Sequence, residues 1–471
     1  MKKYTTIALA VAGLAIAGCK DNAVVNPVDA PTVEALSGAL TRGSLQQVAT
    51  GVLAQDRAAV VGTFTFYVLS GIFARDLYRI DASEPRYVQE TLGGNPDPGS
   101  FAGGGGWTQF YTAIRAANNL LLALPTASSI ELSNAEKSAT AGFIKTIKAL
   151  DYYRLAELRD TVGIAIQTDD ASAVTDIRCK TASLAYIASL LDSALTDLNA
   201  AGGATKLPFV LPTGYTAFGR DYSTVSNIIL FNRGLKGKVN FYRGLDRTAP
   251  QPALFATAIA ELTQALGGAA PGGVPASRFS WGPYYNFVPG GSENTANNRA
   301  DARIGLNPMV RDSIQAGDTR ASKIVTITPI TGFGVSTNSA FSGSVTSNAA
   351  NASAPIGILR DEELVLLRAQ AYIEAGNLGA AAADLNSVRT TYGLAPIALT
   401  SLQQARSAVL YEKRYSLLFE GPQRLVDLRG YGRLNATFFR RELPTDPFNA
   451  AFPIPRAEQD ARGGSVTGCV A

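Results

Sequence analysis

The feature that most constrains the fold is a recurring pair of amphipathic helices. Its plan is visible in three stretches, residues 139–199, 224–266 and 361–390. In the last of them, Leu364, Leu367 and Ala371 recur at helical spacing before Gly376 interrupts the pattern. Such periodicity predicts helices that bury one face each. We therefore expect a mostly α fold; an ordinary helical domain without a repeat is the alternative to a repeating one.

Between these stretches the sequence changes in kind. Residues 268–358 are rich in Gly, Ser, Thr, Asn and Pro, with a strand-like run at 324–327, and residues 91–106 indicate a loop. The helix pairs resemble tetratricopeptide units, which need stacked neighbours to bury their apolar faces. We expect a superhelical scaffold of helix pairs that carries long irregular loop and short-strand insertions. Ligand-binding residues lie disproportionately on such loops.

The chain of 471 residues contains no histidine. This excludes a Ser-His-Asp triad and, with only three cysteines, a Cys/His zinc site. Carboxylate, lysine or tyrosine chemistry remains possible. Without Lys2 and Lys3 the charged residues nearly balance, so the sequence does not indicate a nucleic-acid surface. We expect no metal and no cofactor, although a role for calcium is left open.

The N-terminus is typical of a lipoprotein signal peptide. Lys2 and Lys3 precede an apolar run at residues 7–17, which is too short to span a bilayer comfortably. The run ends in Ile-Ala-Gly-Cys19, a tetrapeptide that resembles the bacterial lipobox. We expect residues 1–18 to be cleaved and Cys19 to be lipidated, and several acyl chains would anchor it stably. An uncleaved helical anchor is the alternative.

Further boundaries follow from this N-terminal interpretation. Residues 19–32 would form a lipidated tether and residues 33–471 a single domain. Its parts are the helix-pair scaffold, roughly 33–90, 107–266 and 359–430, and the irregular ligand-binding region, roughly 268–358. The residues after Cys19 begin Lys-Asp-Asn, which is similar to a short signal that sends lipoproteins to the cell surface.

Several motifs occur in order along the chain: Trp107-x-x-Phe110-Tyr111, Ala149-x-x-Tyr152-Tyr153, Gly219-Arg220, Asp318-x-Arg320, Leu359-Arg360-x-x-Glu363, Phe419-Glu420-Gly421-x-x-Arg424-x-x-Asp427 and Phe452-Pro453-Ile454-Pro455. Together they resemble the SusD/RagB family of outer-membrane nutrient-binding lipoproteins. The resemblance extends over roughly residues 30–460, but the Ser/Thr/Asn stretch at 335–353 matches no element of the family. It implies a tetratricopeptide-like helical fold and a lid on a TonB-dependent, SusC-like outer-membrane transporter, which captures oligosaccharides or peptides.

Two aromatic stretches are candidate ligand platforms. Their candidate residues are Trp281, Tyr284 and Tyr285 in the first, and Tyr78, Asp81 and Arg86 in the second. The first stretch has a turn-like sequence in the irregular region, where exposed rings would stack on the apolar face of a sugar. Ordinary loop packing is the alternative for both stretches. Trp107, by contrast, is expected in the core.

A group of charged residues near the C-terminus invites interpretation as an active site. Its members are Glu412, Arg414, Glu420, Arg424 and Asp427. Glu420 and Arg424 are spaced i, i+4 and would face each other on a helix. Because no nucleophile or histidine joins them, we interpret the group as a structural ion-pair network.

Cys179 and Cys469 remain after Cys19 is assigned to the lipid. In an oxidising exterior two such cysteines tend to pair, which predicts a disulfide between them. Two free thiols are the alternative.

These observations favour a surface lipoprotein that binds oligosaccharides without transforming them. A peptide-binding lid of the same type is the second hypothesis. A lipid-anchored glycoside hydrolase is the third, and it would need two carboxylates about 5–9 Å apart across a cleft. A pure scaffold for protein partners is the fourth.

Overall fold

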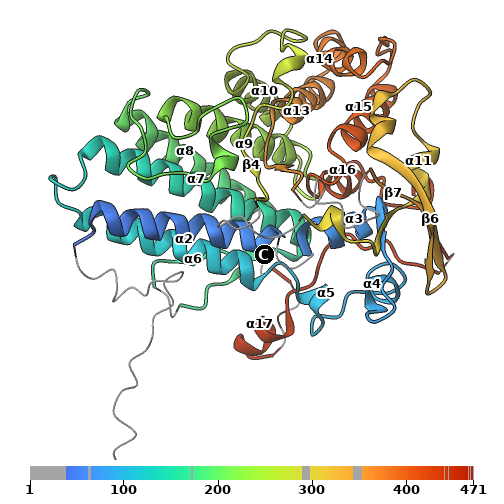
Figure 1. Ribbon diagram of the computed structural model, residues 1–471, viewed down its shortest axis with the longest axis horizontal. Coiled ribbons are helices and arrows are strands. Elements are labelled where there is room, and N and C mark those ends of the chain that lie inside the picture. Colours follow the sequence, from blue (N-terminus) through green and yellow to red (C-terminus); the bar gives the residue numbers. More distant parts are fainter. Residues whose placement is uncertain are drawn as a thin grey trace, which may run out of the picture.

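The computed structural model describes residues 39–61, 65–170, 173–288, 297–342, 353–439, 441–443, 445–464, 466 and 468–469. The predicted signal peptide, the tether and Cys19 lie outside the described residues. Figure 1 shows long helices side by side over most of the molecule, with a β-hairpin at one end.

The long helices are α2 (Arg42–Val61), α6 (Thr108–Ala123), α7 (Asn134–Arg159), α8 (Lys180–Ala201), α9 (Val225–Gly244), α10 (Leu254–Ala265), α13 (Asp361–Glu374), α14 (Leu378–Thr391) and α15 (Leu402–Ser416). Each packs mainly on its neighbours: α2 on α6, then α6, α7, α8, α9 and α10 in turn, α10 on α13, and α13 on α14 and α15. The three stretches predicted as helix pairs are α7–α8, α9–α10 and α13–α14. The prediction of a mostly α, tetratricopeptide-like scaffold is confirmed.

Local sequence explains where these helices begin and end. Ser133 caps α7 by accepting from the Glu136 backbone N–H, while the Glu136 carboxylate accepts from the Ser133 backbone N–H. This capping box satisfies donors that the first helical turn leaves open. Between α13 and α14, Gly376 adopts a φ of 79°, and Asn377 then caps α14 by accepting from the Ala380 backbone N–H. A left-handed residue at a helix end favours glycine.

Shorter helical elements connect and cover the scaffold: the π-helical η1 (Thr65–Leu69), the α-helices α3 (Ser70–Phe73), α4 (Arg86–Gln89), α5 (Phe101–Gly104), α11 (Pro308–Asp312), α16 (Gln423–Gly430) and α17 (Arg456–Ala461), and the 3-10 turns η2 (Leu124–Thr126), η3 (Asp160–Val162), η4 (Thr213–Tyr215), η5 (Ala276–Arg278), η6 (Asn298–Ala300) and η7 (Thr319–Lys323). In the described residues no helix is long and apolar enough to cross a membrane.

The strands form small antiparallel pairs: β1 (Leu77–Arg79) with β5 (Ile304–Leu306), β2 (Ile164–Ala165) with β3 (Ile177–Arg178), β4 (Tyr284–Tyr285) with β8 (Ile356–Gly357), and β6 (Ile324–Gly332) with β7 (Val335–Phe341). The strand-like run predicted at residues 324–327 forms the start of β6. The β6–β7 hairpin lies at the opposite end of the molecule from the turn between α6 and α7 (Figure 1).

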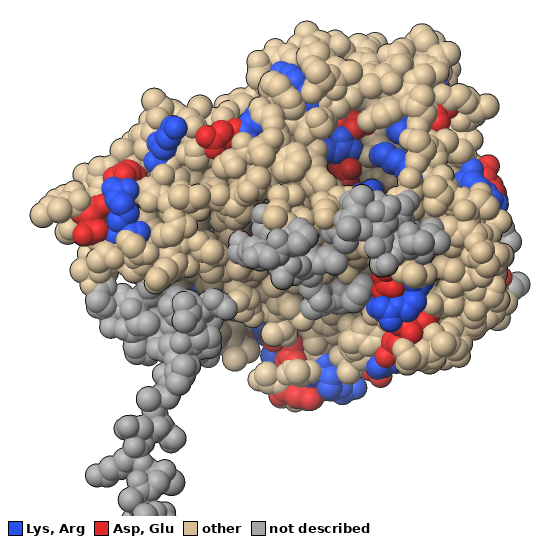
Figure 2. Space-filling view, viewed as in Figure 1, with Lys and Arg blue, Asp and Glu red and all other residues tan. Residues whose placement is uncertain are grey.

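A continuous apolar core runs through the helical scaffold and reaches the short strands. Trp107 is 3% exposed, so its predicted place in the core is confirmed. On the face seen in Figure 2, basic and acidic side chains lie beside one another and do not form a patch of one sign. This face therefore lacks the basic footprint that a nucleic-acid surface requires.

Candidate functional site

The first predicted platform is built into the fold through strand β4. Tyr284 and Tyr285 pair with Gly357 and Ile356 of β8. Tyr284 is 9% exposed and Tyr285 is 2% exposed. The Tyr285 hydroxyl donates to both oxygens of Asp56, at 3.1 and 2.9 Å. The expectation that these rings lie exposed on a turn is wrong, because the segment forms a strand and both rings are buried.

The ring of Tyr284 is fixed by a stacking contact and by a hydrogen bond from its hydroxyl. It stacks on Phe218 with ring centroids 4.3 Å apart, and its hydroxyl donates to the Ser280 carbonyl at 2.7 Å. A Cβ added at Gly214 would lie 2.0 Å from the Tyr284 carbonyl oxygen, so η4 packs directly on the β4 backbone. The Tyr284 side chain therefore packs within the irregular region.

Trp281 is half-buried, and two guanidinium groups lie over its ring. They belong to Arg220 and Arg278, whose carbon atoms lie 5.5 and 5.3 Å from the ring centroid. Both arginines bind the buried carboxylate of Asp361 at the start of α13, Arg220 through two hydrogen bonds of 2.6 and 2.8 Å. Trp281 keeps part of its surface exposed, but two cations already lie over its ring.

The second predicted platform is also divided between core and surface. Tyr78, in β1, is 5% exposed and donates to Glu442 at 2.6 Å. Asp81 is 6% exposed and pairs with Arg79 and Arg303, and a hydrogen bond from Ser83 lowers the pKa of its carboxyl group. The expectation of a surface platform is therefore wrong for Tyr78 and Asp81.

Arg86 is the member of this stretch that stays exposed. Its guanidinium pairs with Glu84 at 2.6 Å and lies over the ring of Phe101. Tyr78 and Tyr284 belong to different strand pairs, so the structure does not join the two predicted stretches into one sheet surface.

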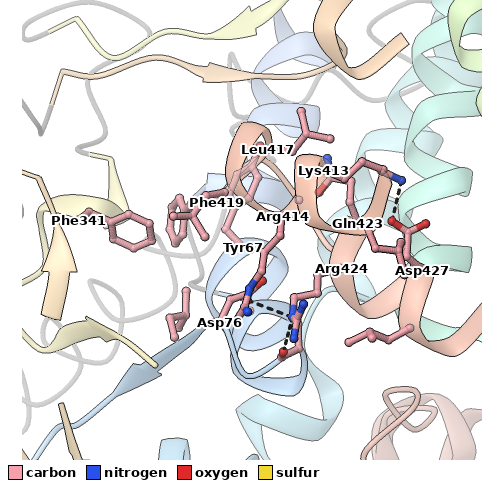
Figure 3. Close-up of a pocket in the computed structure, with 17 residues that line it drawn as sticks. Tyr67, Asp76, Phe341, Lys413, Arg414, Leu417, Phe419, Gln423, Arg424 and Asp427 are labelled. Carbon is pink, nitrogen blue, oxygen red and sulfur yellow. Dashed lines mark hydrogen bonds and ion pairs between the residues drawn. The ribbon is translucent and has the colours of Figure 1, made fainter. Parts of the chain in front are cut away.

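A pocket instead opens where η1, α3 and β1 meet the end of β7 and the α15–α16 connection. The residues that line it are Tyr67, Gly71, Ala74, Asp76, Leu77, Phe341, Leu410, Lys413, Arg414, Leu417, Leu418, Phe419, Gly421, Gln423, Arg424, Asp427 and Leu428. Figure 3 shows aromatic rings on one side and charged side chains on the other.

The aromatic wall centres on Phe419. Its ring stacks on Tyr67 with centroids 5.6 Å apart and meets Phe341 edge-on at 5.0 Å. The backbone of Phe419 has a φ of 65°, a left-handed conformation that bulky residues rarely adopt. Such strain persists where surrounding contacts enforce it, and it concentrates at binding sites.

The charged wall centres on Asp76. The Nε atoms of Arg414 and Arg424 lie 2.9 and 3.1 Å from the same oxygen of Asp76, and both side chains point toward it in Figure 3. Lys413 pairs separately with Asp427 at 2.7 Å. Three cations thus meet two carboxylates, which leaves the lining with one surplus positive charge.

The surplus positive charge affects the pKa of Arg424. Burial, reinforced by the nearby Arg414 guanidinium, lowers the pKa of the Arg424 guanidinium to about 10. Two polar atoms of lining residues are buried without a hydrogen-bond partner: Nη2 of Arg414 and Oε1 of Gln423. Arg414 is 9% exposed and Gln423 4%. A donor and an acceptor are therefore left open in one pocket.

The pocket is narrow. The space open to the centre of a water molecule is about 30 Å³. Whole-ligand pockets usually measure about 300–1,000 Å³, whereas one water needs only about 10–15 Å³. The pocket can therefore take a small polar group, and it cannot enclose a sugar ring.

The arrangement does not provide a carboxylate pair for glycoside hydrolysis. Asp76 is neutralised by two guanidinium groups, and Asp427 is held by Lys413 and the Tyr242 hydroxyl. A hydrolase needs one carboxyl that keeps its proton and a second that acts on the substrate across a cleft. In the described residues no group of three metal-ligating side chains is suited to hold an ion either.

Sequence analysis identified only part of this pocket. Arg414 and Arg424 take part in ion pairs, as expected, but their partner is Asp76. The predicted helix-face pair of Glu420 and Arg424 is wrong. Glu420 precedes α16 and pairs with Arg360 at 2.7 Å, because the chain turns at Gly421 with a φ of 133°.

The cysteines outside the N-terminal segment are joined. Cys179, at the start of α8, and Cys469, near the C-terminus, form a disulfide with an S–S distance of 2.08 Å. The bond fastens the C-terminal tail to the α7–α8 part of the scaffold. A Cβ added at Gly163 would lie 2.8 Å from the Cβ of Cys469, so the tail packs closely there.

Comparison with known proteins places the C-terminal part of the chain in a family. Residues 310–460 match the sequence model of the SusD family. No curated protein matches the chain.

Solved structures match nearly the whole fold. A SusD superfamily protein from Bacteroides fragilis NCTC 9343 aligns with a TM-score of 0.65 at 14% identity, over 90% of this chain and 97% of that chain. Surface glycan-binding protein A from Bacteroides thetaiotaomicron aligns with a TM-score of 0.66 at 13% identity, over 90% of this chain and 98% of that chain. The same protein in complex with laminarihexaose aligns with a TM-score of 0.63 at 14% identity, over 90% of this chain and 99% of that chain.

The matched segment contains the β6–β7 hairpin, the helices from α13 to α16 and most of α11 and α17. It includes the Asp318, Arg360 and Arg424 motifs and most of the pocket lining. The chain therefore matches the SusD family in sequence over residues 310–460 and shares the fold of SusD-like structures over nine-tenths of its length.

Proposed function

We propose that this protein is a cell-surface lipoprotein that binds oligosaccharides and delivers them to a TonB-dependent outer-membrane transporter. One observation carries the proposal. The fold matches, over nine-tenths of the chain, structures named as surface glycan-binding proteins, one of them solved with laminarihexaose. A peptide-binding lid would share this fold, but no peptide ligand is named among these structures.

Binding without catalysis fits the chemistry of the described residues. The carboxylates that line the pocket are each held by cations. The chain also lacks histidine, the commonest general base. We therefore propose that the ligand leaves unchanged and that the protein is not an enzyme.

The proposed anchor is the lipid on Cys19, after removal of residues 1–18. Residues 19–32 would then act as the tether, and the folded domain would begin near residue 33. Surface lipidation would place the protein at the outer membrane beside a SusC-like transporter. Among the ligand residues predicted from sequence, Trp281 and Arg86 keep exposed surface and remain candidates.

The test is calorimetric titration of the lipid-free protein, starting at residue 20, against plant and microbial oligosaccharides and a mixture of peptides. Saturable heat with a glycan supports the proposal. Replacing Trp281 by Ala then tests whether this half-buried ring contributes to binding, while Trp107 stays intact in the core. Saturable binding to peptides with none to glycans would replace the proposal by the peptide-binding lid.

A further inference from the structure

The pocket around Asp76 has features that restrict the kind of group it can hold. Its surplus positive charge favours an anion, because neighbouring guanidinium groups repel each other when only one carboxylate lies between them. The lowered pKa of the Arg424 guanidinium reflects burial and this repulsion. An anion near Arg414 would relieve it.

The donor of Arg414 that has no hydrogen-bond partner also favours an anion. A buried guanidinium N–H that lacks an acceptor carries a desolvation cost, and an ionised acceptor removes that cost more fully than a neutral one. Arg414 Nη2 is such a donor. The walls beside it, Tyr67, Leu417 and Phe419, are apolar or aromatic, so a charge-assisted hydrogen bond formed here is weakly screened.

The open acceptor narrows the choice among anions. Gln423 Oε1 needs a donor, and its amide Nε2 is already committed to the Glu420 carbonyl at 2.9 Å. Fully ionised sulfate and carboxylate groups offer no donor. A sugar acid carries a carboxylate and a hydroxyl on adjacent carbons, so it supplies both the acceptor for Arg414 and the donor for Gln423.

Size fits the same ligand. About 30 Å³ admits a carboxylate or a hydroxyl but not the ring that bears them. We propose that this pocket is a subsite for the carboxylate of an acidic sugar, so that the glycans bound by this protein contain uronic-acid-type residues. This inference rests on the proposed function, since it assigns the class of glycan.

The test compares two probes that differ in charge. Calorimetric titration with digalacturonic acid and with the neutral disaccharide galactobiose is carried out at low salt and again at 0.5 M NaCl. We expect the acidic probe to bind about tenfold more tightly at low salt, with the preference shrinking as salt screens the charge. Equal affinity for the two probes would overturn the subsite while leaving glycan binding intact.

Variants locate the preference in the pocket. Arg414→Gln should abolish the acidic preference, whereas Asp76→Asn, which adds surplus positive charge, should increase it. The two substitutions change the same ion pair but have opposite expected effects, so general damage to the fold cannot produce both. Arg303→Gln, at an exposed arginine outside the pocket, is the matched control, and thermal unfolding confirms that each variant folds.

The remaining outcomes separate the two proposals. An acidic preference that survives Arg414→Gln and is unchanged by Asp76→Asn would overturn the assignment to this pocket. Failure to bind any sugar would overturn the proposed function itself. Binding of peptides through a C-terminal carboxylate, with none of digalacturonic acid, would overturn the sugar-acid assignment.

Discussion

Tyr285 and Asp56 are joined by a buried hydrogen bond that links strand β4 to helix α2. Arg154 of α7 pairs with the same carboxylate, so three segments far apart in sequence meet at Asp56. The ring that the sequence suggested as a ligand platform is therefore part of the junction between the helical scaffold and the irregular region.

Tyr285→Phe removes this hydrogen bond and keeps the ring. Because the acceptor is a buried carboxylate, we expect a loss of about 1–3 kcal/mol in the free energy of unfolding. Urea unfolding measures it. Tyr186→Phe, at a half-buried ring on α8, is the control and should cost less. Equal losses in the two variants would mean that the Tyr285 bond contributes little.

Tyr284→Ala should destabilise the fold rather than affect binding alone. The ring is 9% exposed and stacks on Phe218, and truncating a buried aromatic side chain costs about 3–5 kcal/mol. The expected result is a lowered thermal midpoint with or without ligand. A variant with the wild-type midpoint but no glycan binding would instead return Tyr284 to the ligand site.

Breaking the disulfide should also lower stability. The bond closes a loop with a sequence separation of 290 residues, for which loop entropy predicts a loss of about 6 kcal/mol, less any strain in the native state. Cys469→Ser should therefore unfold at a lower temperature. Reductant should lower the midpoint of the wild type toward that of the variant and leave the variant unchanged. Alkylation of both thiols in unreduced protein would show that the bond does not form.

Lys148 is a buried amine, 7% exposed, and no carboxylate lies within 4 Å of it in the described residues. Burial lowers the pKa of its amino group to about 8; Asp169 opposes this, while Lys145 and Arg115 add to it. Between pH 8 and pH 10.5 the amine is protonated in the unfolded chain and largely neutral in the folded protein. The free energy of unfolding therefore rises with pH in this range.

Lys148→Met should therefore be more stable than the wild type at pH 7, by up to about 3 kcal/mol. The gain should shrink between pH 8 and pH 10, where the folded wild type holds a neutral amine. Urea unfolding at pH 7 and at pH 10 measures the gain in stability. Lys206→Met, at an exposed lysine, is the control. A gain independent of pH would contradict the buried-amine interpretation.

The helical scaffold was predictable because its signal is local. Leu364, Leu367 and Ala371 define one face of α13 within a few residues, and Gly376 marks its end without reference to any other segment. The aromatic platform failed for the opposite reason. The Tyr284 ring is buried through contacts that are distant in sequence: it stacks on Phe218, and its strand pairs with β8. The residues around Tyr284 do not predict either contact.

The pocket was predictable in part. The sequence gathers Arg414, Arg424 and Asp427 within one short region, but Asp76 comes from the other end of the chain. Phe341 ends a β-hairpin in a stretch that matched no motif of the family. A cluster of charges in sequence therefore indicated where ion pairs form, and only the fold showed that they share a cavity.

The most direct test of glycan binding without catalysis follows the ligand itself. The oligosaccharide that gives saturable heat is incubated with the protein for a day, recovered and analysed by chromatography. A glycan-binding lid predicts saturable binding and fully intact oligosaccharide. Shortened products that increase with protein concentration would contradict that function, and so would the absence of binding to every glycan tested.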